Sequence, residues 1–133
     1  MTSTVEYKGN LRCESTHLKS GNSFLTDAPV DNQGKGEAFS PTDTVATGLA
    51  SCMLTVMGIK AADMGIELSG SKAQVTKIMD ANPRRISQID VVLDMKGGCD
   101  KRAQLILERV GNTCPVHNSL HPDIVKNITF NWS

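Results

Sequence analysis

The longest periodic stretch of the chain is SPTDTVATGLASCMLTVMGIKAADM, residues 40–64. Its first residues favour a helix start, because Ser40 suits the N-cap, Pro41 the first helical position and Asp43 the reaching carboxylate of a capping box. Apolar residues follow at spacings of 4, 3, 4 and 3, at Val45, Leu49, Cys52, Val56 and Ile59. Since its other faces are also largely apolar, this helix, ending near Gly65, is predicted to be the core of the domain.

Strand and turn patterns flank the helix on both sides. Before it, alternating residues and turn pairs predict three strands, at residues 4–8, 11–17 and 23–26. A loop is expected between them and the helix. After the helix we expect a hairpin of two strands, two helices and a last strand, at residues 67–79, 85–95, 101–110, 113–120 and 123–132. The order βββ-α-ββ-αα-β predicts one α+β domain over residues 1–133.

Length and charge argue against several classes of function. The chain has 133 residues, and 14 Lys+Arg balance 14 Asp+Glu to give a formal net charge of zero. A nucleic acid partner is not expected, because phosphate neutralisation requires an excess of basic residues. No apolar run approaches the ~20 residues of a membrane span, and the first residues lack an apolar signal. We therefore expect a cytoplasmic protein with no membrane partner.

Two of the four cysteines, Cys52 and Cys114, are candidates for a reactive thiol. Cys52 lies within the apolar helix, where most cysteines are simply small buried residues, so a reactive Cys52 needs a cation or strong donor from another element. Cys114 precedes Pro115 and is therefore predicted to be the N-cap of a helix, whose dipole lowers a thiol pKa toward the thiolate. Cys13 and Cys99 fit no motif. In a cytoplasmic chain, thiols or redox centres are favoured over a disulfide scaffold.

A metal site is an alternative use of these residues. His117 and His121 are four positions apart and share one predicted helix face, so with Cys52 they are a conceivable zinc ligand set. The chain has no Cys-x-x-Cys pair, and Pro122 limits the helix. These features favour ordinary histidines at the surface or the edge of the core, with His117 placed to tune Cys114.

The stretch FSPTDTVATGLASC at residues 39–52, together with NTCPVH at residues 112–117, closely resembles the OsmC/Ohr family (osmotically inducible protein C and organic hydroperoxide resistance protein). The resemblance covers most of the chain, and the two motifs contain cysteines about 60 residues apart. It implies antiparallel sheets wrapped around a long central helix in an intertwined homodimer, with two active sites between subunits. It also implies reduction of organic hydroperoxides by thiols, with no metal or haem cofactor.

The resemblance assigns a role to each motif cysteine. Cys52 matches the peroxidatic cysteine, and Cys114 matches the resolving one. The implied reaction is attack of the Cys52 thiolate on the peroxide, release of an alcohol, and condensation of the sulfenic acid with Cys114 to a disulfide. An external dithiol, either a protein or a small molecule, then reduces the disulfide. Apolar lining from Met53 and Met57 would suit an organic peroxide.

The group that activates the thiolate departs from the family pattern. In active peroxidases of the family an arginine from the N-terminal strands does this, held by a glutamate ten residues before the cysteine. That position is Thr42 here, with Asp43 beside it. Lys19 lies near the expected place of the cation and Arg12 is close by, although a lysine lacks the planar fork of an arginine. The candidates for thiolate activation are therefore Lys19, Arg12, Asp43 and His117.

A second hypothesis keeps the same dimer without catalysis. In it the protein binds a small apolar or electrophilic ligand, and Cys52 only lines the pocket. The two hypotheses differ in Cys52→Ser, which abolishes turnover under the first and preserves ligand-dependent thermal stabilisation under the second.

Overall fold

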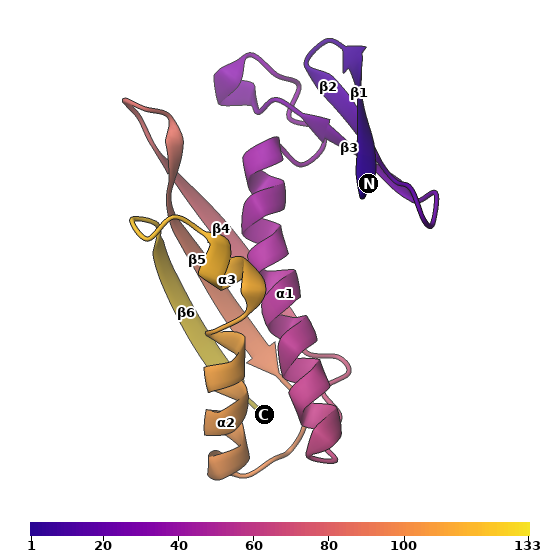
Figure 1. The fold of residues 1–133 in the computed structure, drawn as a ribbon. Coiled ribbons are helices and arrows are strands. Elements are labelled where there is room, and N and C mark those ends of the chain that lie inside the picture. Colours follow the sequence, from indigo (N-terminus) through magenta and orange to yellow (C-terminus); the bar gives the residue numbers. More distant parts are fainter. The chain divides into compact units, whose positions relative to one another are not determined.

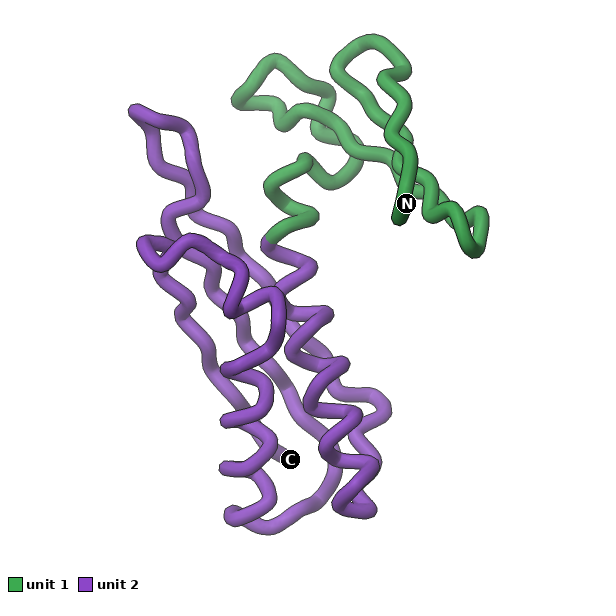
Figure 2. The backbone as a smooth tube through the Cα atoms, viewed as in Figure 1, with its two compact units in different colours: residues 1–45 green, residues 46–133 purple.

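The computed structural model describes all 133 residues, which form two compact units, unit 1 (residues 1–45) and unit 2 (residues 46–133) (Figures 1 and 2). The elements are β1 (Ser3–Gly9), β2 (Arg12–His17), β3 (Ser23–Asp27), a 3-10 turn η1 (Val30–Asn32), α1 (Pro41–Asp63), β4 (Lys72–Asp80), β5 (Arg85–Met95), α2 (Lys101–Gly111), α3 (Pro115–Ser119) and β6 (Val125–Trp132). This order confirms the predicted sequence of strands and helices. The single domain over residues 1–133 stays a prediction.

Unit 1 contains an antiparallel sheet in the order β1-β2-β3. The β1–β2 hairpin closes on Asn10 and Leu11, which both have a positive φ, the conformation that a tight two-residue hairpin turn requires. The apolar side chains of β1 are largely exposed, with Val5 at 64% and Tyr7 at 63%. The strand therefore contributes little to a core in the single chain.

The start of α1 forms through contacts between neighbouring residues. Ser40 Oγ accepts the Asp43 N–H at 3.1 Å, and Asp43 Oδ2 accepts the Ser40 N–H at 2.9 Å, which is the predicted capping box. At the other end Gly65 has φ +69°, and the Ile66 N–H donates to the Ala61 carbonyl at 2.9 Å. The predicted limits of this helix are confirmed.

Unit 2 builds its core between α1, α2 and one sheet (Figure 1). Fully buried side chains come from three elements: Leu49, Met53 and Met57 of α1, Ile89, Val91 and Leu93 of β5, and Leu107 of α2. The sheet has the order β4-β5-β6, and β4 and β5 form the predicted antiparallel hairpin. β6 pairs with β5 in parallel, because α2 and α3 return the chain to the same end of the sheet. This sheet is therefore mixed rather than wholly antiparallel.

Most element limits differ from the sequence prediction by one to five residues, and the start of β4 and the end of α2 have an identifiable local cause. β4 begins at Lys72 instead of residue 67, because Ser69 bonds back to the Glu67 carboxylate and the Ser71 N–H donates to the Leu68 carbonyl, which together make a turn. Gly111, predicted to end α2, is its last helical residue. A Cβ at Gly111 would lie 2.8 Å from Met57 Sδ, so the glycine permits close packing of α2 on α1.

The expectation that no stretch is long and apolar enough for a membrane span is wrong for α1. Its 23 residues meet that criterion by length and composition alone. The core helix of a soluble protein meets the same criterion, and Leu49, Met53 and Met57 are fully buried in unit 2. Burial against the sheet and α2 accounts for part of this apolar composition, since 33% of the apolar window of α1 is buried in the chain.

Candidate active site

Cys114 occupies the turn between α2 and α3. Its backbone is extended, with φ −67° and ψ 156°, and Pro115 follows as the first residue of α3. Cys114 Sγ accepts the backbone N–H of His117 at 3.4 Å. The cysteine is thus the N-cap of α3, as the Cys-Pro pair predicted, and this hydrogen bond fixes the direction of its sulfur.

The fold of unit 2 brings the two motif cysteines together. Cys52 lies in the middle of α1, half-buried against the core, and Cys114 belongs to that core with 1% of its surface exposed. The two thiols are neighbours, because Cys52 is among the groups that raise the pKa of the Cys114 thiol. All four cysteines of the chain are free thiols. The arrangement is a reduced dithiol whose members are about 60 residues apart in sequence.

The direction of the Cys114 pKa contradicts the expectation from the helix dipole. Burial raises the pKa of this thiol, and the His117 N–H, which lowers it, does not compensate; the neighbouring Cys52 raises it further. The helix that Cys114 caps has only five residues, whereas its sulfur is almost fully removed from water. Cys114 is therefore a protonated thiol at neutral pH rather than a thiolate.

His117 contributes its backbone to this site and no positive charge. Burial, followed by the charge of Lys126, lowers the pKa of its imidazole, so the ring is neutral at pH 7. His117 is therefore not a source of positive charge at neutral pH, and its predicted part in tuning Cys114 stays a prediction. His121 lies beside Asp123, 3.8 Å from its carboxylate. No three His, Cys, Asp or Glu side chains cluster as metal ligands would, so the alternative with Cys52, His117 and His121 has no ligand set.

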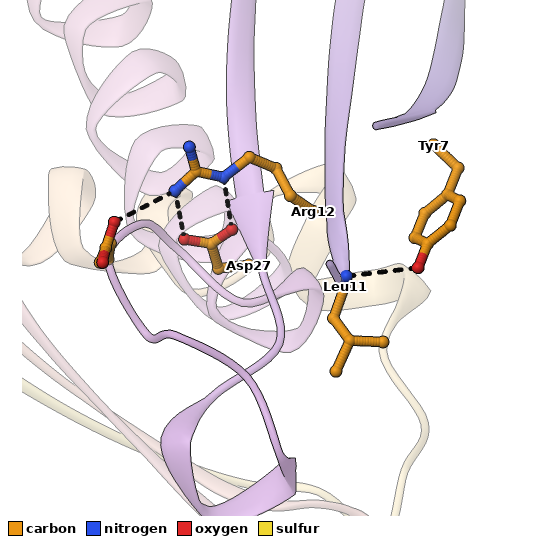
Figure 3. A network of polar contacts seen from close by, with 5 residues as sticks. Tyr7, Leu11, Arg12 and Asp27 are labelled. Atoms are coloured by element: carbon orange, nitrogen blue, oxygen red, sulfur yellow. Dashed lines mark hydrogen bonds and ion pairs between the residues drawn. The ribbon is translucent and has the colours of Figure 1, made fainter. Parts of the chain in front are cut away.

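Unit 1 holds an ion pair at the start of β2 (Figure 3). Arg12 Nε donates to Asp27 Oδ1 at 2.7 Å and Arg12 Nη2 donates to Asp27 Oδ2 at 2.8 Å, while Glu37 lies 3.5 Å from Nη2. The Asp27 side chain is buried, with 1% exposed. The bonds from Arg12 hold the pKa of Asp27 below its ordinary value, and the same carboxylate raises the pKa of Arg12. The guanidinium is therefore permanently charged and fixed in direction.

Asp27 is the functional candidate that the sequence analysis missed. Arg12 and Asp27 are directly opposite each other in the β2–β3 register. Opposite charges at matching positions of a predicted hairpin would have been the signal. Asp27, rather than a residue at the start of α1, supplies the carboxylate for Arg12.

The other two activation candidates have different environments. Lys19 is exposed in the turn after β2. Arg12 is at the other end of this six-residue strand, which is about 20 Å long. Asp43 forms the capping box of α1, and the Thr42 hydroxyl lies 3.2 Å from Ser40 Oγ. Of the candidates in unit 1, only Arg12 presents a guanidinium fixed by a buried carboxylate.

Comparison with known proteins gives a consistent family assignment. The family model described as OsmC-like protein matches residues 34–129, which include both motif cysteines. No curated protein matches the chain significantly.

Solved structures resemble the whole chain. A protein of Psychrobacter arcticus 273-4, whose proposed role is an osmotic stress induced and detoxification response, is 52% identical with a TM-score of 0.95, and the match covers 98% of this chain and 96% of that one. The organic hydroperoxide resistance protein OsmC of Legionella pneumophila is 17% identical, with a TM-score of 0.72 and coverage of 98% and 97%. The organic hydroperoxide resistance protein OhrB of Bacillus subtilis is also 17% identical, with a TM-score of 0.67 and coverage of 98% of each chain. The last two, at low identity, share the fold.

Proposed function

Because this chain belongs to the OsmC-like protein family, we propose that it is a thiol-dependent peroxidase that reduces organic hydroperoxides. The observation that carries the proposal is the pair of neighbouring free thiols, Cys52 and Cys114, on different elements of unit 2. The names of the similar structures, which associate this fold with organic hydroperoxide resistance, support the choice of substrate class.

The reaction has three balanced steps. The Cys52 thiolate attacks the distal oxygen of ROOH, so that an S–O bond forms, the O–O bond breaks and the alkoxide takes a proton to leave as ROH. The Cys114 thiol then displaces water from the Cys52 sulfenic acid, which forms the Cys52–Cys114 disulfide. An external dithiol reduces this disulfide by two thiol exchanges and becomes a disulfide itself.

Burial supports this assignment of the attacking and resolving roles. Cys52 is half-buried and can meet a peroxide from solvent, whereas Cys114 has 1% of its surface exposed. The raised pKa of Cys114 also keeps it protonated, and a protonated thiol is a poor nucleophile toward a peroxide. Cys114 needs only to reach the sulfur beside it, which is the task of a resolving cysteine.

We propose Arg12 as the cation that activates the Cys52 thiolate. Asp27 holds its Nε and Nη2, which leaves Nη1 as a donor with no partner in the chain. A fixed guanidinium stabilises a thiolate and a leaving alkoxide without the reorganisation that a flexible ammonium such as Lys19 requires. The buried carboxylate of Asp27 thus takes the part that the family gives to a glutamate in the central helix.

The proposed partners are a second copy of the chain and a dithiol reductant. Large apolar side chains are exposed in the single chain, among them Val5, Tyr7 and Ile59 at 63–64%. A homodimer would remove such side chains from water, in keeping with the dimer that the family implies. Four free cysteines also suit the reducing cytoplasm, which is the compartment that we propose.

The experiment is cysteine mapping by mass spectrometry after treatment with cumene hydroperoxide. We expect the wild-type protein to form a Cys52–Cys114 disulfide and Cys114→Ser to stop at a Cys52 sulfenic acid that dimedone traps. Cys13→Ser and Cys99→Ser are the matched controls and should behave as wild type. The peroxidase proposal is refuted if both thiols stay free under excess hydroperoxide, and ligand-dependent thermal stabilisation that survives Cys52→Ser would then favour the non-catalytic hypothesis.

A further inference from the structure

Unit 2 contains a cavity of about 430 Å³ that the peroxidase proposal does not use. It lies between the end of α1 and the first half of α2. Its apolar wall comes from Met64, Ile66 and Ile106, and Cys99, Asp100 and Arg102 also line it. This volume falls within the range of about 300–1,000 Å³ that small-molecule sites occupy. Neither Cys52 nor Cys114 belongs to it.

The charges at this cavity favour an anion. Arg102 is exposed and makes no ion pair in the chain, so its guanidinium is available to a ligand. The Asp100 carboxylate, by contrast, caps α2, because its Oδ1 accepts the Ala103 N–H at 2.9 Å. Asp100 is thus engaged with the N-terminal end of α2, which leaves Arg102 as the charged side chain of the lining that has no partner in the chain.

We propose that this cavity binds a carboxylate with a short hydrocarbon chain. The hydrocarbon packs against Met64, Ile66 and Ile106, and the carboxylate pairs with the fork of Arg102 at the rim. A carboxylate is preferred because a planar guanidinium bonds it through two parallel N–H donors. The inference does not depend on the peroxidase activity, because it uses none of the same side chains.

The test uses octanoate as the probe and Cys99 as the reporter. Cys99 is a half-buried free thiol in the cavity wall, so a bound ligand should slow its alkylation. The alkylation rate of each cysteine is followed by peptide mass spectrometry in the full reduced chain. We expect octanoate to slow alkylation of Cys99 in a saturable way and to leave the rate at Cys13, which lies in unit 1, unchanged.

A pair of variants separates charge recognition from nonspecific binding. Arg102→Gln should weaken octanoate binding by roughly threefold, the scale of an exposed ion pair. Lys101→Gln removes the same charge one position away, outside the cavity lining, and should bind octanoate as wild type does. Octylamine, which has the same chain and the opposite charge, should not protect Cys99.

Three results would overturn this proposal. They are no saturable protection of Cys99 by octanoate, equal protection by octylamine, and unchanged octanoate binding in Arg102→Gln. None of them bears on the disulfide between Cys52 and Cys114, so this proposal and the peroxidase proposal fail separately.

Discussion

Asp27 and Cys114 are equally buried, each with 1% exposed, yet their pKa values move in opposite directions. Asp27 in unit 1 faces the Arg12 guanidinium, whose hydrogen bonds outweigh burial and lower its pKa. Cys114 in unit 2 faces a neutral thiol and a backbone N–H, so burial dominates and raises its pKa. The presence of a cation, rather than the depth of burial, therefore determines the direction in which the pKa of each of these two buried acids moves.

Under the peroxidase proposal, the Cys52 thiolate requires a positive charge nearby. His117 is a neutral ring, so it provides no positive charge at Cys114. The Arg12 guanidinium, by contrast, is a positive charge held in place, because Asp27 accepts hydrogen bonds from its Nε and Nη2. The peroxidase proposal therefore takes its positive charge from Arg12 rather than from His117.

The largest expected effect comes from removing the attacking thiol. Cys52→Ser should lower hydroperoxide turnover by at least about 1,000-fold, because no other thiol in the pair has the accessibility that attack requires. Cys114→Ser should retain the first oxidation but fail to turn over. The measurement is steady-state consumption of cumene hydroperoxide with a dithiol, with Cys99→Ser as the control that keeps wild-type activity.

The next effect tests whether Arg12 is the source of charge. Arg12→Gln should slow oxidation of Cys52 by roughly a hundredfold, because an oriented donor to the developing charge is lost. Arg109→Gln, which removes an exposed arginine of α2, is the matched control and should keep the wild-type rate. Stopped-flow oxidation of the reduced protein measures both, and equal rates for the two variants would contradict the role of Arg12.

The same Arg12→Gln variant should also raise the pKa of the Asp27 carboxyl. Without the hydrogen bonds and charge of Arg12, burial is opposed only by the Glu37 N–H and the charge of Lys35, so the pKa of Asp27 should rise from its wild-type value. A pH titration of the Asp27 carboxyl carbon by NMR gives the direction. If its pKa stays low without Arg12, the explanation of the comparison is wrong.

Packing beside Cys114 is tested at Gly111. Gly111→Ala places a methyl group within 2.8 Å of Met57 Sδ and should destabilise the fold by about 1–3 kcal/mol through overpacking. Gly48→Ala, in the interior of α1 with open space around it, should instead stabilise by up to about 1 kcal/mol. Urea unfolding of both variants measures the difference, and a stabilising Gly111→Ala would refute the close packing of α2 on α1.

The smallest effect is the pH dependence of the free energy of unfolding, in which Asp27 governs an acid limb and Cys114 governs an alkaline limb. The lowered pKa of Asp27 gives stability that is present above the ordinary carboxyl pKa of about 3.9 and is lost as the pH falls through the lowered value. The raised pKa of Cys114 gives stability that is present below the ordinary thiol pKa and is lost as the pH rises through the raised value.

Two variants separate these limbs. Asp27→Asn should flatten the acid limb of the free energy of unfolding without changing the alkaline limb, and Cys114→Ser should do the reverse. Urea midpoints between about pH 3 and pH 10 provide the measurement, a range that spans both ordinary pKa values. A Cys114→Ser protein with an unchanged alkaline limb would show that burial does not raise the pKa of this thiol.

Features set by neighbouring residues could be predicted from the sequence. The capping box of Ser40 and Asp43, the end of α1 at Gly65 and the N-cap position of Cys114 before Pro115 all depend on residues within one turn. The order of strands and helices followed from the same kind of local pattern.

Features that depend on tertiary packing could not be predicted in this way. The predicted lowering of the Cys114 pKa was wrong, because the thiol is buried by a core whose residues come from α1, β5 and α2 and are distant in sequence. Glycine commonly follows the end of a helix, but Gly111 is the last residue of α2, where it packs against Met57. Asp27 was missed because its importance arises only from the cross-strand pairing with Arg12. The parallel pairing of β6 likewise depends on where α2 and α3 return the chain.

The most direct test of the account is to locate the first oxidation. The reduced wild-type protein receives less than one equivalent of cumene hydroperoxide with dimedone present, and the sulfenic acid adduct is mapped within the first fraction of the reaction. The account predicts that the adduct lies on Cys52, because Cys114 is buried and protonated. An adduct on Cys114 that forms first would contradict it.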